Sequence, residues 1–158
     1  MKLADVLLKE MVLLDIDPFK DKDELFRTMS ERFEKAGIVT KAEAFYQSLL
    51  AREEEGSTVF ADYSLAMPHG ICDEVVKPGV GFCRVKEPFT YASGDETGEV
   101  KYVFMLAIEG GNSEARGEHL QILGQLARLM MHEEFREILE TADSYETMMS
   151  EIQKLTDE

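Results

Sequence analysis

His69 is the residue whose surroundings say most about chemistry. It lies in the segment 65–70, which reads LAMPHG. Pro68 fixes its own φ angle and favours an extended backbone at Met67, whereas Gly70 lets the chain turn. We therefore expect His69 to be presented at the rigid end of a short strand. A neutral imidazole held there is suited to act as a nucleophile.

His119 is the second candidate, because it lies on the inward face of a predicted helix. This helix follows the most apolar predicted strand, and helix N-termini at the carboxyl ends of strands favour anions. A histidine nucleophile beside a second histidine suits phosphoryl transfer, although a lone inward-facing histidine is also typical of a hydrogen-bonded core residue. His132, 13 positions later, falls on another helix face and is assigned no function. The apolar residues that follow His119 at helical spacing are Ile122, Leu123, Leu126 and Met130.

Arg52 is the third candidate, on the same predicted helix face as Phe45 and Leu49. The planar fork of a guanidinium suits the oxygens of a phosphoryl group. Alternatively, Arg52 is a C-terminal cation that favours the helix dipole while its stem covers apolar surface. We expect residues 53–55, three glutamates, to be a solvated run that interacts electrostatically with Arg52.

Other chemistries are less well supported by the sequence. His69, Cys72 and His119 could supply three metal ligands, but nothing marks a fourth. Neither Cys72 nor Cys83 lies in a sequence that suggests an activated thiol of a protease-like site. No glycine-rich phosphate loop of the nucleotide type is present, which disfavours ATP as a phosphoryl donor.

The composition predicts one globular domain over residues 1–158. The formal net charge of −15, from 32 acidic and 17 basic residues, argues against nucleic acid and anionic membranes as partners. It permits a basic protein partner, or serves solubility alone. No apolar run reaches membrane-spanning length and no signal-peptide pattern is present, so we expect no membrane insertion and a cytoplasmic protein.

Short apolar runs alternate with longer amphipathic stretches, which predicts an α/β fold. The apolar run at 100–108 predicts a strand covered on both faces in the middle of the sheet. The other predicted strands are 12–16, 57–61, 64–67 and 80–85, with a turn or small hairpin at 91–99. Helices are predicted at 3–11, at 21–37 with Asp21 as N-cap, after a capping box at Thr40, from Asn112 or Ser113 to Met131, and at 133–141 and 144–155.

With these motifs the chain resembles the enzyme IIA domains of the bacterial phosphoenolpyruvate-dependent sugar phosphotransferase system, in the mannitol/fructose class. That class also holds ascorbate-, galactitol- and nitrogen-regulatory-type members. The resemblance covers nearly the whole chain. Val59–Ser64 stands where many members have a glycine-rich stretch, so we expect a different rim near His69. The segments that carry the resemblance are the helix 21–37, REEEGST at 52–58, LAMPHG at 65–70, and His119-Leu120 with Leu123, Leu126, Ala127 and Leu129.

The resemblance implies a mixed sheet of about five strands with helices on both faces. It also implies that His69 accepts the phosphoryl group, with His119 and Arg52 beside it, and that no metal or organic cofactor takes part. The donor would be the phosphorylated histidine-containing carrier protein, and the acceptor an enzyme IIB of a carbohydrate uptake system. The alternative is a nitrogen-regulatory-type IIA, which would be a phosphorylation-dependent binding module.

Overall fold

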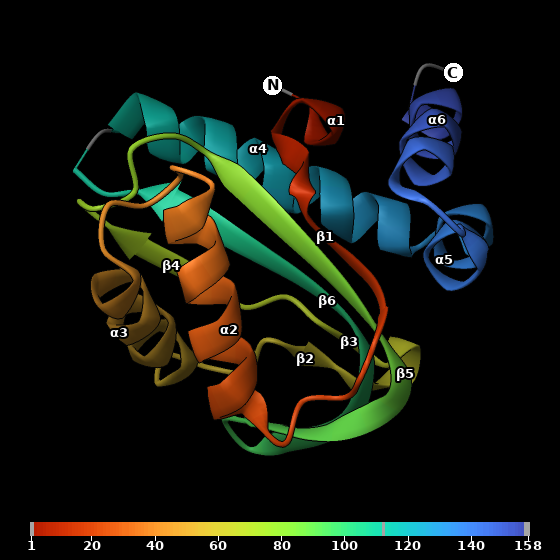
Figure 1. Cartoon of the computed structure of the whole chain (residues 1–158), viewed down its shortest axis with the longest axis horizontal. Coiled ribbons are helices and arrows are strands. Elements are labelled where there is room, and N and C mark those ends of the chain that lie inside the picture. Colours follow the sequence, from red (N-terminus) through yellow and green to blue (C-terminus); the bar gives the residue numbers. More distant parts are fainter. Residues whose placement is uncertain (1, 112, 157–158) are drawn as a thin grey trace.

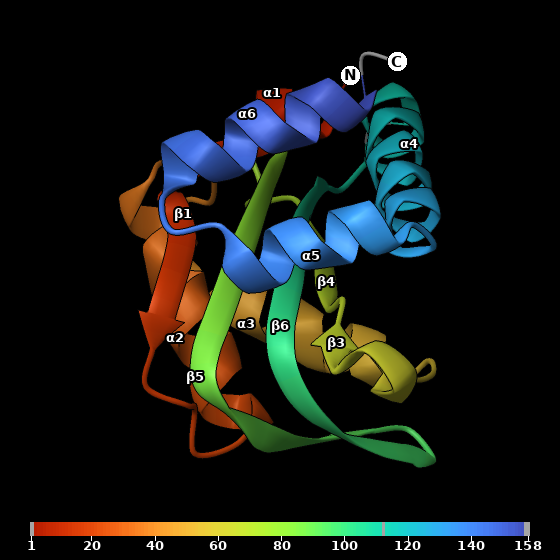
Figure 2. The ribbon, with the colours of Figure 1, turned by 90° about the vertical axis from the view of Figure 1, so that its right-hand side faces the viewer.

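A computed structural model of the chain describes residues 2–111 and 113–156, which form a mixed β-sheet between two layers of helices (Figures 1 and 2). The predicted α/β class is confirmed, with six strands rather than about five. The strands are β1 (Leu7–Ile16), β2 (Val59–Phe60), β3 (Leu65–Ala66), β4 (His69–Cys72), β5 (Gly79–Ser93) and β6 (Glu96–Glu109). The helices are α1 (Leu3–Val6), α2 (Lys22–Lys35), α3 (Ala42–Glu53), α4 (Ser113–Met130), α5 (Glu133–Thr141) and α6 (Tyr145–Thr156), with a 3₁₀ turn at Ala61–Tyr63.

The sheet has the strand order β1-β5-β6-β3-β2, and β4 also pairs with β6. β5 and β6 form a long antiparallel hairpin, to which β1 adds in parallel along one side. β3 and β4 pair with β6 in parallel, one after the other along its length. The most apolar predicted strand, β6, therefore lies in the middle of the sheet as its sequence indicates.

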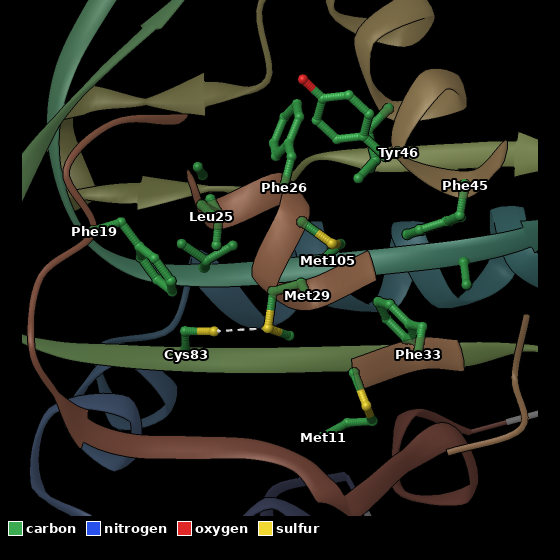
Figure 3. Packing of buried hydrophobic residues seen from close by; sticks show 14 of the residues in the cluster. Met11, Phe19, Leu25, Phe26, Met29, Phe33, Phe45, Tyr46, Cys83 and Met105 are labelled. Carbon is green, nitrogen blue, oxygen red and sulfur yellow. Dashed lines mark hydrogen bonds between the residues drawn. The ribbon is translucent and has the colours of Figure 1, made fainter. Parts of the chain in front are cut away.

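Helices α2 and α3 cover one face of the sheet, where their apolar side chains meet those of β5 and β6 (Figure 3). Asp21 caps α2, because its side chain accepts a hydrogen bond from the backbone N–H of Glu24 at 2.9 Å. Phe33 of α2 meets Phe45 of α3 edge to face at 5.2 Å between ring centroids. The buried side chains that α2 contributes are Leu25, Phe26, Met29, Ser30 and Phe33.

Helices α1, α4, α5 and α6 cover the opposite face (Figure 2). Phe104 of β6 lies between Phe82 of β5 and Phe135 of α5, with centroid distances of 4.8 and 6.1 Å. The two faces of β6 thus follow the alternation of a strand, since Phe104, Leu106 and Ile108 point to this side.

Several boundaries differ from the predictions. The first helix is short, because β1 begins at Leu7, which pairs with Val80. Thr40 is not the cap of α3: Lys41 is, and Glu34 of α2 accepts the N–H of Ala42 instead. Of the two predicted caps of α4, Asn112 lies outside the described residues. The second predicted cap, Ser113, is the first residue of the helix.

The strand β4 was not predicted, and it changes the position of His69. The predicted strand 64–67 is reduced to β3, and His69 begins β4 after Pro68. His69 therefore lies at the start of a strand that pairs with β6, rather than at the end of the preceding one. Its backbone is fixed by the sheet on one side and by the proline on the other.

A buried arginine joins the edge strand β1 to the helical layer. Arg84 binds the carboxylate of Asp15 through two hydrogen bonds of 2.9 Å. It also donates to the carbonyls of Leu139 and Glu140 at the end of α5, at 3.0 and 3.3 Å. Asp15 has a positive φ of 56°, a conformation that aspartate and asparagine tolerate better than most residues.

Within residues 2–111 and 113–156, no helix has both the length and the apolar character needed to cross a membrane.

Candidate functional site

Arg52 and His69 are in direct contact. Arg52 lies in the last turn of α3, and its Nε donates a hydrogen bond of 2.9 Å to Nε2 of His69. Its Nη1 donates to the carbonyl of Gly56 at 3.1 Å, in the loop after the helix. The guanidinium is therefore held by two partners with its charge turned toward the imidazole.

The contacts of His69 define which ring nitrogen carries the proton. A guanidinium is always protonated, so Nε2 must accept its hydrogen bond through a lone pair. The other nitrogen, Nδ1, lies 3.3 Å from the carbonyl oxygen of Met67. In the neutral ring Nδ1 therefore donates, and Nε2 is the atom with nucleophilic character.

The surroundings keep the His69 ring neutral. Partial burial lowers the pKa of His69 below its ordinary value of 6.5, and the positive charge of Arg52 lowers it further. The carbonyl of Met67 and the carboxylates of Glu53 and Glu55 oppose these effects without reversing the direction. The nucleophilic form is thus the main form at neutral pH.

His119 lies on the inward face of α4, as predicted, and is 3% exposed. Its Nε2 atom is buried and has no hydrogen-bond partner in the described structure. The ring lines a cavity of about 10 Å³ together with Leu106 and Ala107 of β6. Burial lowers the pKa of His119 as well, against the opposing charges of Glu109 and Glu118, so this ring too favours the neutral form.

The strand register puts His69 and His119 on the same face of the sheet. His69 on β4 is paired with Leu106 on β6, and paired residues point to the same side. Leu106 belongs to the apolar cluster under α4, and it lines the same small cavity as His119. The next residue, Gly70, points the other way, since an added Cβ would meet Phe45 and Ser48 of α3. His119 is therefore one strand away from His69, on the same side.

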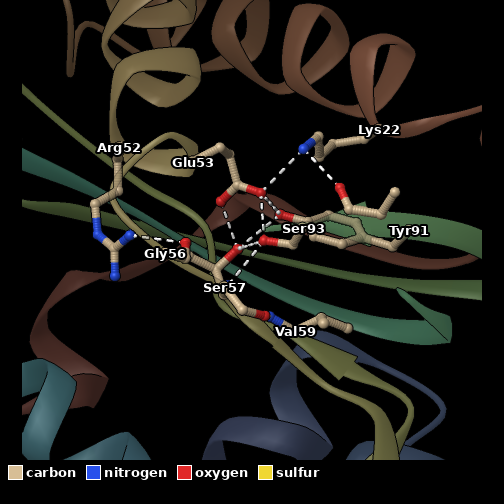
Figure 4. Close-up of polar contacts among 10 residues, drawn as sticks. Lys22, Arg52, Glu53, Gly56, Ser57, Val59, Tyr91 and Ser93 are labelled. Carbon is tan, nitrogen blue, oxygen red and sulfur yellow. Dashed lines mark hydrogen bonds and ion pairs between the residues drawn. The ribbon is translucent and has the colours of Figure 1, made fainter. Parts of the chain in front are cut away.

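Glu53 is the residue at this site that the sequence prediction missed. It is buried rather than solvated, and only Glu54 and Glu55 of the run are exposed. Helical spacing could have found it, because it follows Leu49 by four positions on the buried side of α3. Its carboxylate accepts hydrogen bonds from Thr58, Ser93, Lys22 and Tyr91, and Figure 4 shows the last three around it.

The alternative sites are not assembled. Cys72 packs toward the α2–α3 face, opposite to His69 on the same strand. Cys83 is fully buried, burial raises its pKa to about 12, and it donates a hydrogen bond to the sulfur of Met29. A thiolate nucleophile at Cys83 is therefore excluded. Over the described ranges, no three histidine, cysteine or acidic side chains are grouped so that they could hold a metal ion.

Residues 5–155 match the family described as "Phosphoenolpyruvate-dependent sugar phosphotransferase system, EIIA 2". The chain belongs to this family. The fructose-specific EIIA component of Haloferax volcanii is 32% identical to it over 139 residues, which are 88% of this chain and 86% of that protein. The fructose-specific EIIABC component of Bacillus subtilis is also 32% identical, over 149 residues. These are 94% of this chain but only 22% of that longer protein.

Solved structures show the same IIA fold. The nitrogen regulatory protein IIA-Ntr from Neisseria meningitidis aligns over 95% of this chain and 98% of its own, with a TM-score of 0.78 and 26% identity. The complex of enzyme IIAMTL and phosphorylated enzyme IIBMTL from Escherichia coli aligns over 96% of this chain and 99% of the matched chain, with a TM-score of 0.69 and 26% identity. The predicted family and its mixed-sheet fold are thus confirmed.

Of the three predicted site residues of this IIA chain, Arg52 and His69 touch, and His119 lies on the same side of the sheet as His69. His132 is exposed at the N-cap of α5, away from this arrangement. The segment 59–64, where a different rim was expected, forms β2 and a 3₁₀ turn, and it leaves Phe60 47% exposed.

Proposed function

We propose that this chain, as one IIA domain, accepts a phosphoryl group on Nε2 of His69 and passes it to a second protein. The observation that carries the proposal is the fixed tautomer of His69. The carbonyl of Met67 accepts a hydrogen bond from Nδ1–H, and the lone pair of Nε2 accepts one from Arg52. This arrangement is that of a nucleophile prepared to attack phosphorus.

In the transfer step the Nε2 lone pair forms a bond to phosphorus while the bond from phosphorus to the donor's histidine nitrogen breaks. The electron pair of the broken bond stays on the donor ring. The His69 ring gains positive charge as it attacks, and the Met67 carbonyl stabilises that charge through Nδ1–H. No proton has to leave during the step, so the reverse reaction uses the same geometry.

Arg52 and His119 supply donors for the phosphoryl oxygens. When Nε2 bonds to phosphorus it no longer accepts from Arg52, and the guanidinium is then free to donate to an oxygen. The unpartnered Nε2 of His119 offers a second polar group on the same side. Phosphoryl transfer depends on positioning and charge stabilisation, and one well-placed donor contributes about 2.7–4 kcal/mol in comparable sites.

The proposed donor is the phosphorylated histidine-containing carrier protein, and the proposed acceptor is an enzyme IIB. The similar Escherichia coli chain was solved together with phosphorylated IIBMTL, which supports a IIB partner. Relatives named fructose-specific and a structure named for mannitol make IIB proteins of these two types the first to test. The net charge of −15 favours a basic surface on the donor.

The test is phosphorylation from the reconstituted general enzymes, with His69→Ala compared with His132→Ala. His69→Ala should abolish acid-labile phosphate incorporation, whereas His132→Ala should label like the wild type because its ring is exposed at the N-cap of α5. Labelling of His69→Ala at wild-type stoichiometry would reject the assignment.

A regulatory role is the second candidate, supported by the similarity to IIA-Ntr at a TM-score of 0.78. The protein would then be phosphorylated on His69 in the same way, but would signal by binding another protein. Discharge of the phosphorylated chain by added IIB separates the two roles. Rapid loss of the phosphoryl group to IIB supports transport, and no loss to any IIB supports regulation.

A further inference from the structure

We propose that Glu53 is a positioning residue, which sets the geometry of both ring nitrogens of His69 through two separate connections. This inference rests on the proposed function, because it assigns a role in the same site. Glu53 does not touch His69. It adjoins Arg52 in the sequence and anchors the loop that follows α3 (Figure 4).

The carboxylate of Glu53 accepts from four donors, which lie in three other segments of the chain. Its Oε2 accepts from Thr58 Oγ1 at 2.5 Å. Its Oε1 accepts from Ser93 Oγ at 2.8 Å, from Lys22 Nζ at 3.2 Å and from Tyr91 OH at 3.3 Å. The end of α3 is thereby fixed to α2, to the loop before β2 and to β5.

The first connection runs to Nε2. The peptide that carries Glu53 also carries Arg52, so fixing Glu53 fixes the direction in which the guanidinium leaves α3. The turn that follows closes with the N–H of Glu55 bonded to the carbonyl of Arg52 at 3.0 Å, and Gly56 then accepts from the guanidinium. These contacts aim Arg52 at His69 Nε2.

The second connection runs to Nδ1. Thr58, held by Glu53 through its hydroxyl and by Ser93 through its N–H, accepts the backbone N–H of Met67 at 2.8 Å through its own carbonyl. The carbonyl of Met67 in turn faces Nδ1 of His69. Displacement of Thr58 would therefore move the group that selects the tautomer.

The four donors require two accepting oxygens, which the charged carboxylate of Glu53 supplies. A glutamine at this position has nearly the same volume, but its NH₂ group cannot accept and would meet donors. Glu53→Gln therefore disturbs both connections at once while leaving the packing of α3 intact. Asp15→Asn is the control: it removes a carboxylate that binds Arg84, on the edge strand β1, and asparagine suits its positive φ.

The experiment measures three quantities for wild type, Glu53→Gln and Asp15→Asn: thermal stability, ¹⁵N shifts of the His69 ring, and kcat and KM for transfer from the phosphorylated carrier. Glu53→Gln should lower kcat by about tenfold, with KM nearly unchanged, since misplacement of a reacting group slows chemistry without weakening binding. Its two ring ¹⁵N shifts should move toward each other as the tautomer becomes mixed. Ser93→Ala, which removes one donor, should change both readouts in the same direction but less.

Two outcomes would overturn the proposal. One is that Glu53→Gln loses stability as Asp15→Asn does, yet keeps wild-type ring shifts and kcat. The other is that Ser93→Ala leaves the shifts unchanged while Glu53→Gln does not fold. The ring shifts need no phosphoryl donor. A wild type that accepts no phosphate would therefore refute the proposed function, while the shifts still decide the role of Glu53.

Discussion

The end of α3 and the first half of α4 carry the predicted site residues, but their buried polar groups differ in whether they have hydrogen-bond partners. At the end of α3, Arg52 and Glu53 have partners for their charged groups within the protein. On α4, the buried Nε2 of His119 has no partner in the described structure. Under the proposed function, the α3 side would hold the nucleophile in place, while the α4 side would offer an unpartnered group to the phosphoryl oxygens.

The unpartnered Nε2 of His119 lowers the stability of the fold. A buried polar atom without a partner destabilises the fold by about 1–3 kcal/mol, whereas a satisfied one is nearly neutral or favourable. An incoming phosphoryl oxygen would remove that cost by binding to the imidazole. Substitutions in α3 and in α4 test this difference between the two helices.

The largest effect is expected for Arg52→Lys. Lysine keeps the charge but has no fork, so it cannot hold Gly56 and reach His69 in the same way. The rate of phosphoryl acceptance by His69, measured in single turnovers, should fall by about 100-fold, as for loss of one aimed donor. A lysine variant that transfers at the wild-type rate would show that charge alone suffices on the α3 side.

A smaller and more revealing effect is expected for His119→Leu. Transfer should fall by about tenfold, but the free energy of unfolding in urea should stay constant or rise by up to about 1 kcal/mol, because an unsatisfied buried group is removed. Ile122→Val, one turn further along the same face, is the control and should lose about 0.5–1.5 kcal/mol while transferring normally. If His119→Leu were instead destabilised like the control and transferred normally, His119 would be a core residue only.

The smallest effect is expected in the pH dependence of stability. The folded pKa of His119 lies below the ordinary value, so the unfolded chain binds more protons there and stability rises with pH. Above pH 6.5 the imidazole is neutral in both the folded and the unfolded chain, so the fold has its full stability. As the pH falls toward the folded pKa, the unfolded chain takes up the proton first and the free energy of unfolding decreases. The unfolding free energy of wild type should therefore drop relative to His119→Leu between pH 7.5 and pH 5. Parallel curves for the two proteins would contradict the lowered pKa.

Much of the fold could be predicted from the sequence, because local signals agree with the tertiary structure over α2, α5, α6 and β6. The cap at Asp21 and the apolar run of β6 are examples. The predicted helix 3–11 was wrong, because parallel pairing with β5 outweighs its helical periodicity from Leu7 on. The strand β4 was missed, since four residues that include a glycine carry little strand signal of their own.

The contact between Arg52 and His69 agrees with the predicted site, whose roles stay predictions, but the residues that support this contact were not predicted. Arg52, His69 and His119 are recognisable by type and spacing, and the structure brings the first two into contact. Glu53 was assigned to solvent with its two neighbours, because a run of three glutamates looks uniform when read by composition. Helical spacing from Leu49 indicates that Glu53 faces inward, but no local pattern identifies its donors, which are at residues 22, 58, 91 and 93.

The strand order also determines when the site can form during synthesis of the chain. His69 leaves the ribosome before β6, the strand with which β4 pairs, and β1 must wait likewise for β5. The nascent chain therefore carries the imidazole and the guanidinium for many residues without the sheet that orients them. Only when the hairpin of β5 and β6 has emerged do these earlier segments gain a template, and α4 with His119 follows later still.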